Sequence, residues 1–67
     1  MNQRLKVYRK LEKLLSKKGI TFYRLSQETG IPTATFSEWK KGTYMPKIDN
    51  LMLIADYLGI SVNELIK

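Results

Sequence analysis

Few side chains in this 67-residue sequence could take part in catalysis. There is no histidine and no cysteine, so the residues that most often act as nucleophiles, proton carriers and transition-metal ligands are missing. The acidic residues stand singly, at Glu12, Glu28, Glu38, Asp49, Asp56 and Glu64, and no glycine-rich loop that could cradle a phosphate is present. We therefore expect a protein that is not an enzyme and that needs neither a metal ion nor a cofactor.

Positive charge is concentrated near the amino terminus. Twelve Lys and Arg residues against six Asp and Glu residues give a net charge of +6. Residues 1–18 hold seven of these basic residues and one acid, whereas residues 19–67 hold five of each. A nucleic acid is an ordinary partner for such a balance. The basic residues of 1–18 also fit a solvated helix surface, or a helix that binds an anionic membrane.

Residues 21–42 carry the pattern that organises the chain. Two short helical patterns meet at Gly30, and their inward apolar residues are Leu25, Ile31, Phe36 and Trp39. Ser26 stands where the two backbones approach most closely, and a sharp turn at Gly30 often needs a positive φ, which glycine adopts without penalty. This spacing predicts a helix-turn-helix unit, whose second helix is of the kind offered to the major groove of DNA.

Periodicity and glycines define the other helices. Apolar residues three and four apart predict a helix over residues 4–18 and another over 48–58. The two helices of the helix-turn-helix are expected over residues 22–29 and from near Pro32 to Gly42, and a last helix follows Ser61. Their inward residues, outside residues 21–42, are Tyr8, Leu11, Leu15, Ile48, Leu51, Ile54, Ala55 and Leu58.

Two helix starts carry capping signals. Thr21 can accept a hydrogen bond from a first-turn amide of the helix that follows it. Ser61 and Glu64 have the spacing of a capping box, and Ile60 can pack against Leu65 as a hydrophobic staple. With five short helices, no strand pattern and no repeat, the chain is predicted to be one all-α domain that spans residues 1–67.

The run GITFYRLSQETGIPTATFSEWKKGTYMPKIDNLMLIADYLGISVNEL, from Gly19 to Leu65, resembles the Cro and phage-repressor (XRE) family of helix-turn-helix proteins. The spacing of Leu25, Ser26 and Gly30, the run FSEWKKG, Pro46 and the ending LMLIADYLGISVNEL carry the resemblance. It implies a compact five-helix domain of the lambda-repressor-like type. It also implies a transcriptional regulator, most often a repressor, that binds double-stranded operator DNA as a symmetric dimer.

The resemblance further implies roles for individual residues. In such proteins the early exposed residues of the second helix of the unit meet base edges, and here these are Thr33, Ala34, Ser37 and Glu38. Phosphates are usually met by the start of the first helix and by the loop after the second. These positions are Thr21, Phe22, Tyr23, Lys40, Lys41, Thr43 and Tyr44, and Lys47 is a further candidate.

Three of these positions leave alternatives open. Many relatives carry glutamine at the position of Phe22, so phosphate anchoring here can shift to Tyr23 or to the amide end at Thr21. Relatives also commonly carry glutamate at the position of Lys40, which is instead free to reach the DNA backbone. Glu38 can accept a hydrogen bond from cytosine, can pair with Lys41 or Arg24, or can exclude DNA sites that offer acceptors.

The carboxyl-terminal part suggests a surface for a second copy. Tyr57, Ile60, Val62, Leu65 and Ile66 present more apolar area than one short helix can bury, so some of them are core and some form a possible dimer surface. The principal alternative function is a protein-interaction or antitoxin-type module on the same fold. A membrane-associated or RNA-binding role for the basic first helix is a second alternative.

No part of the sequence is expected to cross a membrane. No window approaches the roughly 18 continuous apolar residues of a membrane-spanning helix. The first residues alternate charged and apolar side chains, unlike the apolar core of a signal peptide. We therefore expect a cytoplasmic protein.

Overall fold

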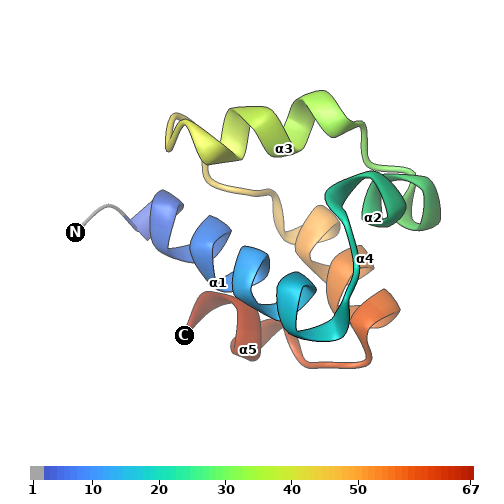
Figure 1. The fold of residues 1–67 in the computed structure, drawn as a ribbon. Coiled ribbons are helices and arrows are strands. Elements are labelled where there is room, and N and C mark those ends of the chain that lie inside the picture. Colours follow the sequence, from blue (N-terminus) through green and yellow to red (C-terminus); the bar gives the residue numbers. More distant parts are fainter. Residues whose placement is uncertain (1–2) are drawn as a thin grey trace.

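The computed structural model describes residues 3–67, and this range contains five helices and no strand (Figure 1). The helices are α1 (Gln3–Lys18), α2 (Phe22–Thr29), α3 (Thr33–Lys40), α4 (Ile48–Leu58) and α5 (Val62–Ile66). Helix α1 packs against α3 on one side and α5 on the other, whereas α4 packs against α2 and α5. The predicted all-α fold with five helices, in which α2 and α3 form the helix-turn-helix, is therefore confirmed.

The core is entirely apolar within the described residues. It takes side chains from all five helices and from the turn between α2 and α3, and burial of each large one contributes about 1.5–3 kcal/mol. The inward residues predicted for the helix-turn-helix are all buried, and Leu25 and Ile54 are 0% exposed. The core residues are Val7, Tyr8, Leu11, Leu15, Leu25, Ile31, Phe36, Trp39, Leu51, Ile54, Ala55, Leu58 and Leu65.

A row of aromatic rings joins α1 to the helix-turn-helix. The rings of Tyr8 and Phe22 are stacked, with centroids 5.4 Å apart and planes 3° apart. Phe22 then contacts Phe36 at 5.3 Å, and Phe36 meets Trp39 edge to face at 5.2 Å. Such pairs each add about 0.5–1.5 kcal/mol beyond the area that they bury. Phe22 thus has a structural role, because it holds the start of α2 against α1.

The turn between α2 and α3 is closed by side chains as well as by backbone. Gly30 has φ 79°, in the left-handed region, and its amide donates to the Ser26 carbonyl at 2.9 Å. The Ser26 hydroxyl donates to the Ile31 carbonyl at 2.5 Å. The Thr29 hydroxyl donates to the Leu25 carbonyl at 2.6 Å. The predicted positive φ at Gly30 is confirmed, and the two hydroxyls add hydrogen bonds on both sides of the turn, one to a carbonyl of α2 and one to a carbonyl between α2 and α3.

The prediction that Ile48 faces the core is wrong. Ile48 is 58% exposed, and Met52, one turn later, is 56% exposed. The buried side of α4 runs through Leu51, Ile54 and Leu58, and residues four apart share one side of a helix. Ile48 therefore lies with Met52 along an edge of α4 that no other described element covers.

The capping box predicted at α5 does not form. Ser61 is the N-cap residue, but its side chain makes no capping hydrogen bond. The Glu64 amide, which the box requires, donates to the Ser61 backbone carbonyl at 3.1 Å. In a helix of five residues a tight first turn of this kind competes with the side-chain cap. The cap at α2 is confirmed, since the Thr21 hydroxyl accepts from the Arg24 amide at 3.0 Å.

Replacing Gly30 by alanine should destabilise the fold through backbone strain alone. A Cβ at this position meets nothing within 4 Å, so the cost comes from the left-handed φ of 79°. We expect a loss of about 1–2 kcal/mol, and a smaller loss for Gly30→Asn, because asparagine tolerates this region better. Thermal unfolding followed by circular dichroism measures both. A Gly30→Ala variant as stable as the parent would contradict the observed turn.

Raising the pH above about 10 should weaken the contribution of Tyr8 to stability. Burial and, secondarily, the nearby Glu12 carboxylate raise the pKa of the Tyr8 phenol above its ordinary 10.0. A phenol whose pKa is raised by folding contributes stability that is full below the unfolded pKa and is lost as pH rises through the folded pKa. Urea unfolding from pH 8 to 11 should therefore show a fall in stability that Tyr8→Phe reduces.

The exposed Tyr44 supplies the control for this measurement. A Tyr44→Phe variant carries the same loss of one phenol, so it should keep the fall seen in the parent chain. Equal slopes for the parent and Tyr8→Phe would show that the Tyr8 phenol does not contribute.

Candidate nucleic-acid interface

The outer side of α3 is small, polar and open to solvent. Phe36 and Trp39 point inward and are each 3% exposed. Thr33, Ala34 and Ser37 lie on the exposed side of the same helix. The Ser37 hydroxyl donates to the Thr33 carbonyl at 3.5 Å, which is long for a hydrogen bond and leaves the hydroxyl easy to redirect. The structure therefore brings three of the four residues predicted to contact bases onto one exposed surface.

The fourth, Glu38, lies at the edge of this surface and is paired. Its carboxylate is 3.4 Å from the Lys41 ammonium, and the two side chains are 44% and 65% exposed. An exposed pair of this kind is worth up to about 1 kcal/mol, so a competing partner can separate it. Lys40 is exposed and makes no ion pair among the described residues. Of the two lysines, Lys40 is therefore the one whose charge is not already balanced.

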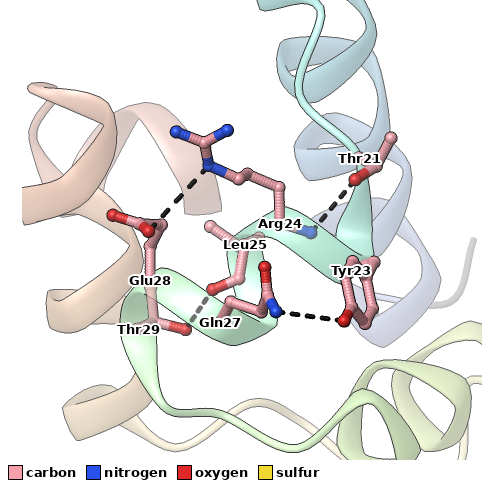
Figure 2. A network of polar contacts seen from close by, with 7 residues as sticks. All are labelled: Thr21, Tyr23, Arg24, Leu25, Gln27, Glu28 and Thr29. Carbon is pink, nitrogen blue, oxygen red and sulfur yellow. Dashed lines mark hydrogen bonds and ion pairs between the residues drawn. The ribbon is translucent and has the colours of Figure 1, made fainter.

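The start of α2 holds an ordered group of polar side chains, shown in Figure 2. Tyr23 is 65% exposed, and its hydroxyl accepts a hydrogen bond from Gln27 Nε2 at 3.0 Å. The Tyr23 hydroxyl keeps its own proton, which it can donate to an anion. Arg24 lies 3.9 Å from Glu28 along the same helix. Gln27 was not among the predicted site residues, although its four-residue spacing from Tyr23 is a signal for such a contact.

Phe22 offers little of its side chain to a ligand. It is half-buried, and its ring is stacked on Tyr8. As the first residue of α2, it still has a backbone amide without a partner within the helix. Any phosphate contact from Phe22 must therefore come from this amide.

The end of α3 and the segment before α4 form a hollow that joins distant residues. Glu38, Tyr44 and Lys47 line it, together with Thr35, Trp39, Met45 and Asn50. Thr43, Tyr44 and Lys47 are all exposed, as the predicted phosphate contacts require. Asn50 was not predicted, because its position in the first turn of α4 gives no sequence signal that it lies near Glu38.

The residues predicted as a dimer surface divide into two kinds. Leu65 is 1% exposed and belongs to the core, so it offers no surface to another molecule. The others, Tyr57, Ile60, Val62 and Ile66, are half-buried and pack against the core. Exposed apolar side chains lie instead on α4, at Ile48, Met52 and Leu53.

An open groove joins the exposed side of α4 to the start of α5. We call it the α4 groove, and it is lined by Asp49, Met52, Leu53, Ala55, Asp56, Ile60 and Val62. Two residues of the predicted dimer surface, Ile60 and Val62, therefore belong to the groove. Sequence periodicity missed Met52 and Leu53 because α4 has apolar residues on more than one side.

The described residues hold no group suited to a metal ion, since no three His, Cys, Asp or Glu side chains gather there. None of the helices in residues 3–67 is long and apolar enough to cross a membrane.

The outward side of the helix-turn-helix is a surface of hydroxyl, phenol, amide and ammonium groups. These are the groups with which proteins contact DNA bases and phosphates.

Of three comparisons with known proteins, one gives a match. The curated proteins and the solved structures give no significant match. Residues 10–67 match the family of Cro/C1-type helix-turn-helix DNA-binding domains, which covers α2–α5 and most of α1. Because the match extends over far more than half of the 67 residues, the chain belongs to the Cro/C1-type helix-turn-helix DNA-binding domain family.

Proposed function

We propose that this protein is a sequence-specific transcriptional repressor of a bacterium or phage, which acts in the cytoplasm. It binds double-stranded operator DNA with α3 in the major groove and blocks access of the polymerase to a promoter. The observation that carries the proposal is the exposed row of Thr33, Ala34 and Ser37 on the second helix of a family DNA-binding unit. Hydroxyl and methyl groups at such positions of a recognition helix can contact base edges in the major groove.

Base recognition in this proposal comes from hydroxyl and methyl groups. Thr33 and Ser37 can exchange hydrogen bonds with several base edges, and Ala34 can pack on a thymine methyl group. Glu38 can accept from cytosine N4 once it leaves Lys41, from which it is 3.4 Å away in the free protein. Separation of that pair also releases Lys41 toward a phosphate.

Phosphate contacts come from both ends of the unit. At the start of α2, the Tyr23 hydroxyl and the free amides near Thr21 and Phe22 can donate to phosphate oxygens. At the end of α3, Lys40 and Lys41 bring positive charge, and Thr43, Tyr44 and Lys47 continue the contact along the loop. Affinity that depends on such contacts falls steeply with salt.

We further propose that the protein acts as a homodimer, at least on DNA. One copy of this size contacts only one half-site, which is too few base pairs for useful selectivity. The α4 groove supports the proposal, because Met52 and Leu53 are 56% and 47% exposed and continue into Ile60 and Val62. A symmetric interface uses the same patch on both copies, so the groove of one can receive α4 of the other.

A protein-interaction or antitoxin-type role is the second candidate, and the same groove favours it. Asp49 and Asp56 stand in the lining of an otherwise mostly apolar groove. A partner helix with apolar and basic residues would complement these groups. The experiments below therefore separate DNA binding from protein binding.

Charge reversal at the end of α3 should abolish binding to operator DNA. The variant Lys40→Glu with Lys41→Glu replaces two candidate phosphate contacts by repulsive charges. The control Lys18→Glu with Lys67→Glu makes the same change in net charge at two exposed lysines outside this surface. We expect the control to bind an operator duplex, selected from random DNA, much as the parent does, as measured by fluorescence anisotropy.

The single variant Lys40→Gln should lower the slope of log affinity against log salt by about 1, since one phosphate contact is lost. Equal binding by the charge-reversed variant and its control would contradict the proposed surface. Failure of the parent chain to bind duplex at high micromolar concentration would reject the regulator role.

Selection of bound fragments from random duplex DNA should yield a two-fold symmetric motif. Its half-sites should lie about one helical turn, or roughly 10 base pairs, apart. Recovery of unrelated fragments alone would count against specific recognition.

A charge placed in the α4 groove should break the dimer. Met52→Glu adds a carboxylate beside Asp49 and Asp56, and burial of an unpaired charge costs several kcal/mol. We expect the dimer dissociation constant to rise on the order of 100-fold or more. Sedimentation equilibrium with and without operator DNA measures this change.

Ser16→Glu, at an exposed position of α1, is the control because it adds the same charge outside the groove. A dimer that survives Met52→Glu would show that the copies meet elsewhere. A parent chain that stays monomeric on its operator would leave the groove to a different protein.

A further inference from the structure

A second surface of this molecule has the charge of a nucleic-acid contact but lies away from the outer side of α3. We propose that the outer side of α1 binds the phosphate backbone of a second DNA duplex, independently of its sequence. The proposal rests on the DNA-binding role proposed above, because it concerns a protein whose α3 already occupies one duplex. The proposal gives a function to the positive charge that lies outside the helix-turn-helix.

The position of these charges follows from the packing of α1. Val7, Tyr8, Leu11 and Leu15 are buried against the rest of the core. Arg9 and Lys13, two positions before and after Leu11, fall on the opposite side of the helix and are exposed. Helix α3 lies on one side of α1 (Figure 1), and it buries Phe36 and Trp39 while the polar residues of its other side stay exposed. The two exposed surfaces therefore belong to different helices that pack together, and we expect one straight duplex on α3 to leave the outer side of α1 open.

Four cations on this side form one continuous site. Lys6, Arg9, Lys10 and Lys13 line a common depression, which we call the α1 basic surface. At 1.5 Å per residue, Lys6 and Lys13 are about 10 Å apart along the helix axis. A duplex carries roughly six phosphate charges over that length. The spacing therefore lets several cations meet one stretch of DNA backbone.

These charges are not balanced within the chain. None of the four residues that line the surface forms an ion pair in the described part of the structure. Glu12, the one acid of residues 1–18, is exposed and forms no ion pair with any of the four. On α2 and α3, by contrast, Arg24 pairs with Glu28 and Lys41 with Glu38. The α1 basic surface therefore keeps its counterions until a polyanion displaces them.

The structure favours DNA over a membrane or a protein as the partner. A helix that binds a membrane inserts its apolar side, but that side of α1 is in the core. Protein interfaces have an apolar centre and are poor in lysine. The exposed large apolar residues of the described chain lie on α2, the segment before α4, and α4, and none is on α1. What α1 offers is charge alone, which is the signature of sequence-independent backbone contact.

Capture of one duplex on another tests this inference. An operator duplex obtained by selection is immobilised and saturated with protein, and a labelled duplex without operator sequence is then added at low salt. The parent chain should retain the labelled duplex. The variant Arg9→Gln with Lys13→Gln should retain on the order of tenfold less or lower, since each lost contact reduces binding several-fold near 0.1 M salt.

The control variant is Lys18→Gln with Lys67→Gln, which removes the same charge from exposed positions outside the α1 basic surface. It should capture the labelled duplex as the parent does. Both double variants should keep the operator affinity of the parent, and circular dichroism should show the same helix content. The salt slope of capture should fall by about two for Arg9→Gln with Lys13→Gln and not for the control.

Three results would overturn the inference. The first is capture by Arg9→Gln with Lys13→Gln at the level of the parent. The second is an equal loss of operator binding by that variant, which would mean that α1 and α3 contact the same duplex. The third is operator binding by the parent with no capture of a second duplex. Absence of operator binding by the parent rejects the proposed function itself, so the two failures are distinguishable.

Discussion

The stack between Tyr8 and Phe22 is the contact on which the presentation of the outer surface of α3 depends. With α2 and α3 at eight residues each, both are shorter than the roughly 12–15 residues that an isolated helix needs in water. Their stability and their direction must therefore come from packing. The nearly parallel rings hold the start of α2 on α1, and Phe36 and Trp39 extend the contact along the inner side of α3. Since the large side chains of α3 are committed inward, its outer side is left with small polar groups.

Charge is divided between two surfaces in a way that matches this packing. The helix-turn-helix pairs Arg24 with Glu28 and Lys41 with Glu38, so it carries little unbalanced charge where base edges would be read. The excess positive charge lies on the outer side of α1, on the α1 basic surface. In our proposals the first surface supplies selectivity and the second supplies attraction that acts over a Debye length of about 10 Å at 0.1 M salt. A strong field placed directly on α3 would instead increase binding to every sequence alike.

Departures from the family pattern become understandable once the neighbours are known. Phe22 stacks on Tyr8 and so holds α2 on α1, in place of the polar side chain expected at this position. Tyr23 beside it is exposed, and Gln27 orients its hydroxyl by a hydrogen bond. At position 40 a lysine stands where the resemblance implies glutamate, and its side chain is exposed and makes no ion pair among the described residues. Similarly, the apolar residues that exceed the needs of the core gather on α4 rather than on α5. Leu65 of the predicted dimer surface is in the core, whereas Met52 and Leu53 are exposed, and our dimer proposal therefore uses α4.

The sequence by itself determined the five helices, the turn at Gly30, the cap at Thr21 and the inward positions of Leu25, Ile31, Phe36 and Trp39. These depend on local causes, namely periodicity, backbone angles and hydrogen bonds within a few residues. Only the tertiary structure decided which edge of a helix another segment covers. That is why Ile48 is exposed, Leu65 is buried and the Ser61 cap gives way to a backbone turn. It also placed Glu38, Tyr44 and Lys47 around one hollow and Tyr8 onto Phe22, because no local pattern encodes the approach of these residues.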